Sequence, residues 1–114
     1  MDVFVPNGST VSLTASAVSQ AVQIQSPPVG GNYRPTVRIR NTATEEVFIV
    51  FGPTSGTVAT TAGIPIAPNS IETLGVPDIV NEVGTGAPFS AYYVAVIAAA
   101  GASGPTYFTP GLGL

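Results

Sequence analysis

Apolar and polar residues alternate along three segments of the chain: residues 10–15, 21–25 and 36–40. In the last of these, Val37 and Ile39 would face a core, and the arginines next to them would face solvent. Successive side chains of a β-strand point to opposite faces, so a period of two is typical of a strand buried on one face. We therefore predict a half-buried strand at each of the three segments.

Other segments predict further strands without this alternation. The runs at 47–51 and 89–98 are apolar throughout, which favours strands covered on both faces. Shorter strands are expected at 64–69, 70–74 and 106–109, separated by loops rich in glycine and proline.

About seven or eight short strands at this spacing predict an all-β protein, a single-domain antiparallel β-sandwich with a jelly-roll-like arrangement. The domain is expected to span residues 1–114. Short flexible terminal arms are expected at about residues 1–8 and 109–114.

Composition supports strands and excludes much of enzyme chemistry. Valine, isoleucine and threonine together make up 36 of the 114 residues, and these branched side chains pack well on a pleated surface. The chain has no histidine, cysteine or lysine. It therefore lacks the Ser-His-Asp and Cys-His nucleophile systems and any thiolate or imidazole metal site. We expect no enzymatic activity and no cofactor.

Charge argues against nucleic acid as a partner, because the formal net charge is −3 and only three residues are positive. A membrane span is not expected either, because the longest apolar stretch has 12 residues, below the ~18 that a helix needs. The first residues also lack the basic and apolar regions of a secretory signal.

The carboxylates and tyrosines offer weaker candidates. Glu46 and Glu72 could form the carboxylate pair of a glycosidase. Asp78 and Glu82 could hold a calcium ion. For both pairs, solvated surface charges are the favoured interpretation. The tyrosines could form a carbohydrate-stacking platform, although core and interface packing is favoured. They are Tyr33, Tyr92, Tyr93 and Tyr107.

The positive charges are concentrated in one short stretch, at Arg34, Arg38 and Arg40. If residues 36–41 and 46–52 form a hairpin, Arg40 would meet Glu45 or Glu46 across the strands in an exposed ion pair worth ~0.2–1 kcal/mol. Alternatively, the arginines would form a face that grips an acidic partner, since guanidinium groups bind carboxylates in bidentate fashion.

The segment 89–98 has no polar face, and charged residues make up only 8% of the chain. A lone sandwich normally exposes a polar face on each strand. We therefore predict that the second face is buried against another chain, in a homo-oligomer or larger assembly, with a trimer favoured over a dimer.

Several short motifs, in this order, resemble small virion proteins of tailed phages and prophages. They are residues 9–13 (STVSL), 37–41 (VRIRN), 47–52 (VFIVFG), 66–72 (IAPNSIE) and 109–114 (TPGLGL). The C-termini of those proteins often resemble T-P-G-E-G-L, and Leu112 stands in place of the acidic residue.

The resemblance implies a non-enzymatic virion structural protein, most like a capsid decoration (cement) protein. Such a protein would be made in the host cytoplasm, bind the major capsid protein on the outer surface of the capsid and bridge its subunits. The partner-binding candidates are Arg34, Arg38, Arg40, Pro110, Leu112 and Leu114. The alternatives are a head fibre, tail or baseplate component, or a carbohydrate-binding module.

Overall fold

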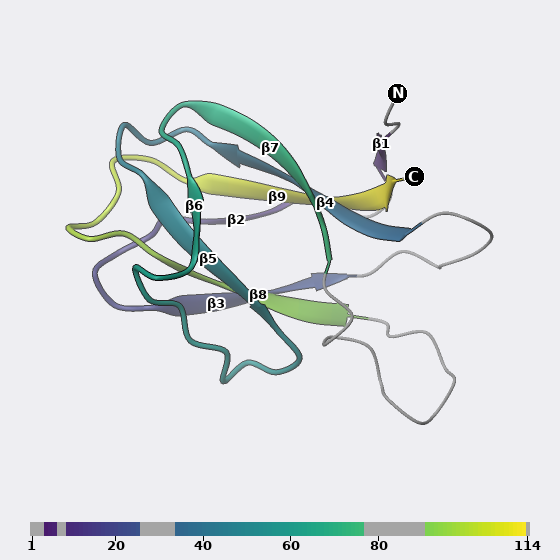
Figure 1. The fold of residues 1–114 in the computed structure, drawn as a ribbon, viewed down its shortest axis with the longest axis horizontal. Helices are drawn as coiled ribbons and strands as arrows, with labels where there is room; N and C mark the ends of the chain where they lie inside the picture. Colours follow the sequence, from purple (N-terminus) through teal and green to yellow (C-terminus); the bar gives the residue numbers. More distant parts are fainter. Residues whose placement is uncertain (1–3, 7–8, 26–33, 77–90, 114) are drawn as a thin grey trace.

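The computed structural model describes residues 4–6, 9–25, 34–76 and 91–113, and the regular elements within them are all β-strands (Figure 1). They are β1 (Phe4–Pro6), β2 (Val11–Leu13), β3 (Gln20–Gln25), β4 (Arg34–Asn41), β5 (Val47–Gly52), β6 (Ile64–Ile66), β7 (Ser70–Gly75), β8 (Ala91–Ile97) and β9 (Thr106–Gly113). The predicted all-β class is confirmed.

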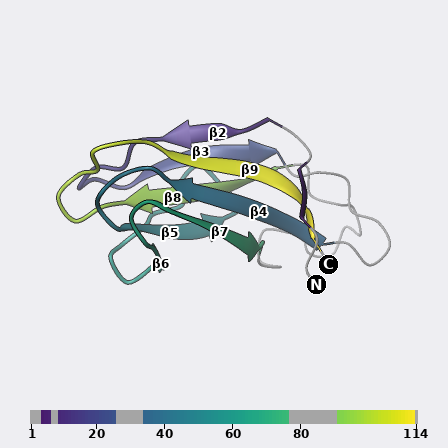
Figure 2. The same ribbon diagram turned by 90° about the horizontal axis from the view of Figure 1, so that it is seen from above.

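The strands form two antiparallel sheets that pack face to face, which confirms the predicted β-sandwich. The first sheet has the order β1-β9-β4-β7, and β2 pairs with the same strand β9 further along its length. The second sheet has the order β3-β8-β5-β6. Figure 2 shows β9, β4 and β7 of the first sheet running side by side.

The chain crosses between the sheets at most of its connections, so residues 36–41 and 46–52 do not meet the condition of forming a hairpin. Strands β4 and β5 follow each other in sequence but lie in different sheets, because both edges of β4 are occupied by β7 and β9. This crossing lets Ile39 of β4 and Ile49 of β5 face the same core, and both are fully buried. The ion pair that depended on the hairpin is therefore not supported.

The two terminal segments also differ from the prediction. The last strand was expected to end at Thr109, but β9 continues to Gly113 and pairs with β4 over its whole length. Residues 4–6 form β1 on the other side of β9. Both described ends are strands of the first sheet, where their backbone N–H and C=O groups find partners; the rest of the expected arms lies outside the described residues.

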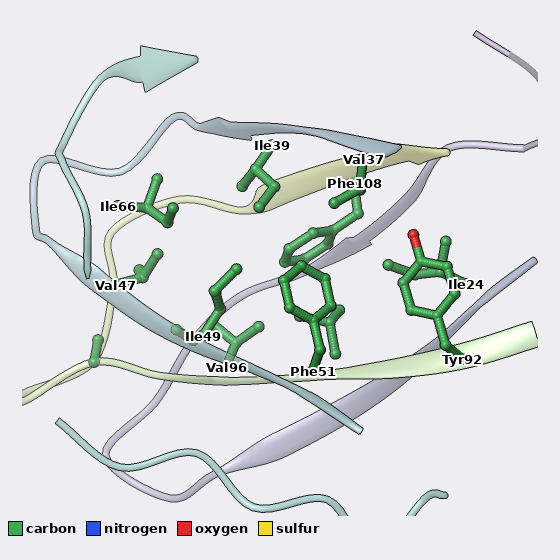
Figure 3. Packing of buried hydrophobic residues seen from close by; sticks show 13 residues of the cluster. Ile24, Val37, Ile39, Val47, Ile49, Phe51, Ile66, Tyr92, Val96 and Phe108 are labelled. Carbon is green, nitrogen blue, oxygen red and sulfur yellow. The ribbon is translucent and has the colours of Figure 1, made fainter. Parts of the chain in front are cut away.

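The core lies between the sheets and draws on both (Figure 3). Phe108 of β9 enters it from the first sheet, and Phe51 and Tyr92 enter it from the second. The rings of Phe51 and Tyr92 lie 6.0 Å apart between centroids, tilted by 57°. Burying each large apolar side chain stabilises the fold by ~1.5–3 kcal/mol, so this layer carries most of the stability.

The second face of β8 is covered in part by the chain itself. Ala95 on that face is fully buried between Ala21 and Val50, its register partners on β3 and β5. The loop 53–63 runs outside this sheet from β5 toward the start of β3, where the Ala59 N–H donates to Ser19 Oγ at 2.8 Å (Figure 1). Tyr93 and Ile97 on the same face are half-buried, so the chain covers this face in part, and the predicted burial against another chain stays a prediction.

Thr106 offers a test of the core. Its side chain is fully buried, and its hydroxyl has no hydrogen-bond partner among the described residues. Thr106→Val keeps the shape and removes the unpaired hydroxyl, so the free energy of unfolding should rise by ~1 kcal/mol. Urea unfolding measures this change. Thr106→Ser, which keeps the hydroxyl and loses a methyl group, should be less stable than the wild type, and a stabilised serine variant would contradict the argument.

Tyr92 makes stability depend on alkaline pH. Burial raises the pKa of its phenol above the ordinary value of 10.0, because the phenolate would lose its hydration. The unfolded chain then releases this proton first, so stability is full below about pH 10 and falls above it, with a slope approaching ~1.4 kcal/mol per pH unit. Thermal unfolding from pH 9 to 11.5 should show this fall, and Tyr92→Phe should flatten it. An equal fall in both proteins would exclude Tyr92 as the cause.

Candidate functional site

The outer face of the first sheet carries the arginines that the sequence singled out. Strand β4 lies at the centre of this sheet, between β9 and β7. Val37 and Ile39 on its inner face are fully buried, whereas Arg38 and Arg40 on its outer face are exposed. The alternation read from the sequence therefore predicted correctly which side of the strand faces solvent.

The strand register places other residues in rows with these arginines. Arg40 lies directly between Tyr107 of β9 and Ile71 of β7, and Arg38 lies in the next row between Thr109 and Thr73. Directly opposite residues of an antiparallel pair share a face, with Cβ atoms ~4.5–5.5 Å apart. The two rows therefore bring together side chains that are far apart in the sequence.

A shallow depression of about 430 Å³ lies over the rows of Arg38 and Arg40. It is lined by Thr10, Arg38, Arg40, Ile71, Tyr107 and Thr109. Ile71 is 62% exposed and Tyr107 is 36% exposed. On one side, Thr10 Oγ1 and Thr109 Oγ1 share a hydrogen bond of 2.9 Å. We call this surface the Arg40 face; it combines a guanidinium group with an exposed aliphatic and an exposed aromatic side chain.

Two acidic residues of the described chain, Glu72 and Glu45, have places other than the rows of the Arg40 face. Glu72 of β7 is the register partner of Ile39, so it belongs to the opposite face of the sheet. Glu45 is held in a loop, where its carboxylate accepts hydrogen bonds from Thr44 Oγ1 and the Ser103 N–H, both at 2.5 Å. These bonds lower the pKa of Glu45 below its ordinary value. The Arg40 face thus carries two arginines, and neither Glu45 nor Glu72 stands in a row with Arg40.

The buried side chain of Asn41, next to Arg40, anchors this end of β4. Its Nδ2 group donates to the backbone carbonyls of Glu45 (2.9 Å), Ala67 (3.2 Å) and Ile66 (3.4 Å). Its Oδ1 atom accepts from the N–H of Ala43 at 3.0 Å. One amide therefore ties the end of β4 to the loop before β5 and to the end of β6, which holds the backbone at Arg40 in place.

The remaining predicted partner-binding residues are placed differently. Pro110 is buried in β9, where it pairs in register with Val37, and so offers no exposed contact. Arg34 and Leu112 lie in β4 and β9, opposite Gly113 and Pro35 respectively. Their side chains are outside the described structure, and Leu114 lies wholly outside the described residues.

The enzyme and carbohydrate candidates are dispersed over the fold. The two members of the candidate glycosidase pair lie at different sheets: Glu46 is exposed just before β5, and Glu72 is exposed in β7. The candidate calcium ligands Asp78 and Glu82 lie outside the described residues. Tyr92 is in the core, Tyr93 is on the outer side of the second sheet and Tyr107 is on the first, so these three tyrosines form no common platform. Tyr33 lies outside the described residues.

The described residues offer neither a metal-ligand cluster nor a membrane-spanning helix. They contain no cluster of three or more potential metal ligands from histidine, cysteine, aspartate and glutamate. Within the same residues, no helix has the length and apolar character needed to cross a membrane.

No family model matches the chain, and neither a curated protein nor a solved structure matches it.

Sequence reasoning found the arginines but missed Ile71 as a member of the site. A usable signal was present: Ile71 and Leu74 are three residues apart, so they point to opposite faces of one strand. One of the two had to face away from the core. Leu74 packs against the core cluster, and Ile71 is the exposed one.

The anchoring role of Asn41 can be tested by Asn41→Ala. Loss of the amide leaves several buried or part-buried backbone groups without their partner, so the free energy of unfolding should fall by about 2–3 kcal/mol. Gln23→Ala, which removes an exposed amide from β3, should change it by less than ~0.5 kcal/mol. Chemical denaturation of both variants measures the difference, and similar effects would show that the Asn41 hydrogen bonds contribute little.

Proposed function

We propose that this chain is a non-enzymatic structural protein of a tailed-phage virion, a capsid decoration protein that binds the outer shell and stabilises the DNA-filled head. The sequence resemblance to small phage virion proteins supports the phage origin. The strand orders β2-β9-β4-β7 and β3-β8-β5-β6 support a jelly-roll arrangement of the sandwich. In this proposal the partner is the major capsid protein, and the decoration protein itself forms a homo-oligomer, favoured as a trimer.

The observation that carries the binding role is the composition of the Arg40 face. Tyrosine and arginine are enriched in protein interfaces, and an exposed aliphatic residue such as Ile71 adds apolar area to them. Arg40 and Tyr107 stand on the paired strands β4 and β9, and Ile71 stands on β7 beside β4, so all three side chains are carried by one sheet rather than by a loop, which gives a preorganised surface. A rigid, mixed apolar and cationic face suits binding to another protein better than it suits catalysis.

The proposed mechanism is mechanical. A standard interface buries ~800 Å² on each partner, and only part of the resulting gain remains after the cost of association. A decoration protein that contacts neighbouring capsid subunits would hold them together, and repetition over the shell would make modest single contacts act jointly through avidity. A head fibre, tail or baseplate component would use the same kind of surface on a different part of the virion.

Co-sedimentation with shells that lack the protein tests this proposal. Purified chain is mixed at increasing concentration with such particles, and the bound amount is measured after pelleting. Saturation at a fixed ratio to the major capsid subunit supports decoration. Light scattering on the free chain gives its oligomeric state.

Purified tails and a panel of glycans serve as parallel binding partners. Binding to tails alone would move the assignment to a tail or baseplate component. Binding to glycans alone would favour a carbohydrate-binding module. Absence of saturable binding to shells contradicts the decoration role in either case.

A further inference from the structure

We propose that the Arg40 face is the docking surface of this protein, and that its occupant is a carboxylate-bearing segment of a partner protein. The proposed function supplies the identity of that partner as a capsid protein. The chemistry of the site rests on the structure alone, so the two proposals can fail separately.

Charge complementarity favours an acidic occupant. The protein has only three positive residues and a net charge of −3, yet two of the three stand together on this face. The nearest neighbours of Arg40 across the sheet are Tyr107 and Ile71, neither of which can neutralise it. A guanidinium group presents a planar fork of donors that matches the two oxygens of a carboxylate.

The neighbours of Arg40 would strengthen such a contact. Ile71 and Tyr107 flank it on both sides within one row, and both are substantially exposed. An occupant that covers them would exclude water from around the guanidinium, and an ion pair is stronger where water is excluded. The same cover would bury apolar area on Ile71. One docked segment could therefore satisfy both the charged and the apolar parts of the face.

The backbone beneath Arg40 is already fixed. Strand β4 is paired on both sides, and Asn41 ties its end to two loops. Binding then has to order only side chains, which lowers its entropic cost. A nucleic acid is a poorer occupant, because several phosphates would meet two arginines on a protein of net negative charge.

The direct test uses hexaglutamate as the probe and amide NMR shifts of the intact chain as the readout. Titration should shift the amides of β4, β7 and β9 around Arg40, Ile71 and Tyr107, and the shifts should weaken as salt is raised. Hexaglutamine at the same concentration should leave them unchanged. Shifts confined to other strands, or an equal response to hexaglutamine, would overturn the proposal.

A matched pair of variants separates the local contact from overall charge. Arg40→Gln and Gln23→Glu each make the net charge more negative by one unit, but only the first alters the Arg40 face; Gln23 is exposed on the other sheet. Arg40→Gln should weaken hexaglutamate binding at least tenfold, whereas Gln23→Glu should change it less than twofold. Arg40→Lys, which keeps the charge without the planar fork, should fall between them. Equal losses for both matched variants would reject a specific site.

The source of the anion and the link to the virion are tested separately. Inorganic phosphate and a short single-stranded DNA should bind at least tenfold more weakly than hexaglutamate, and tighter binding of either would overturn the choice of a carboxylate.

On shells, Arg40→Gln should raise the concentration needed for half-saturation at least tenfold. If wild type and Arg40→Gln bind shells equally, the docking surface is wrong and decoration stands. If hexaglutamate binding depends on Arg40 but shells bind neither protein, decoration is wrong and the site stands.

Discussion

The pairing of β4 with β9 is the constraint on which the rest of the structure depends. The two strands are joined in register from Arg34 opposite Gly113 to Asn41 opposite Thr106, across a separation of more than half the chain. This pairing leaves one side of β9 for β1 and β2 and one side of β4 for β7. Because the side-chain period of a strand is two, a slip of one residue would exchange the buried face for the exposed one.

The same pairing couples the core to the surface. Ile39 and Phe108 are register partners that both enter the core, and the next pair, Arg40 and Tyr107, both face outward. The apolar area buried by the inner residues holds the outer residues in a fixed row. A surface built in this way is as rigid as the sheet that carries it, so the proposed docking face rests on the same contacts as the stability of the fold.

The second sheet completes the core and is itself partly covered from outside. The loop 53–63 reaches from β5 to Ser19, and Gly63 lies so close to β5 that an added Cβ would meet Ile49 O at 2.7 Å. Only glycine allows this approach. The outer side of the second sheet is therefore more enclosed than that of the first. This asymmetry agrees with the proposal that places the docking surface on the first sheet.

The sequence by itself determined the local structure of this protein: the strand class, the approximate strand positions and the direction in which Val37, Arg38, Ile39 and Arg40 point. These properties follow from a period of two, which is a local rule. Which strands are neighbours was decided only by the tertiary structure, because pairing depends on contacts between distant segments. That is why the sequence left open a hairpin of β4 with β5 that does not form, and why β9 continues to Gly113 through residues that were interpreted as a tail. The Arg40 face has the same origin: Ile71 and Tyr107 join Arg40 only through strand register, which no single segment of the sequence contains.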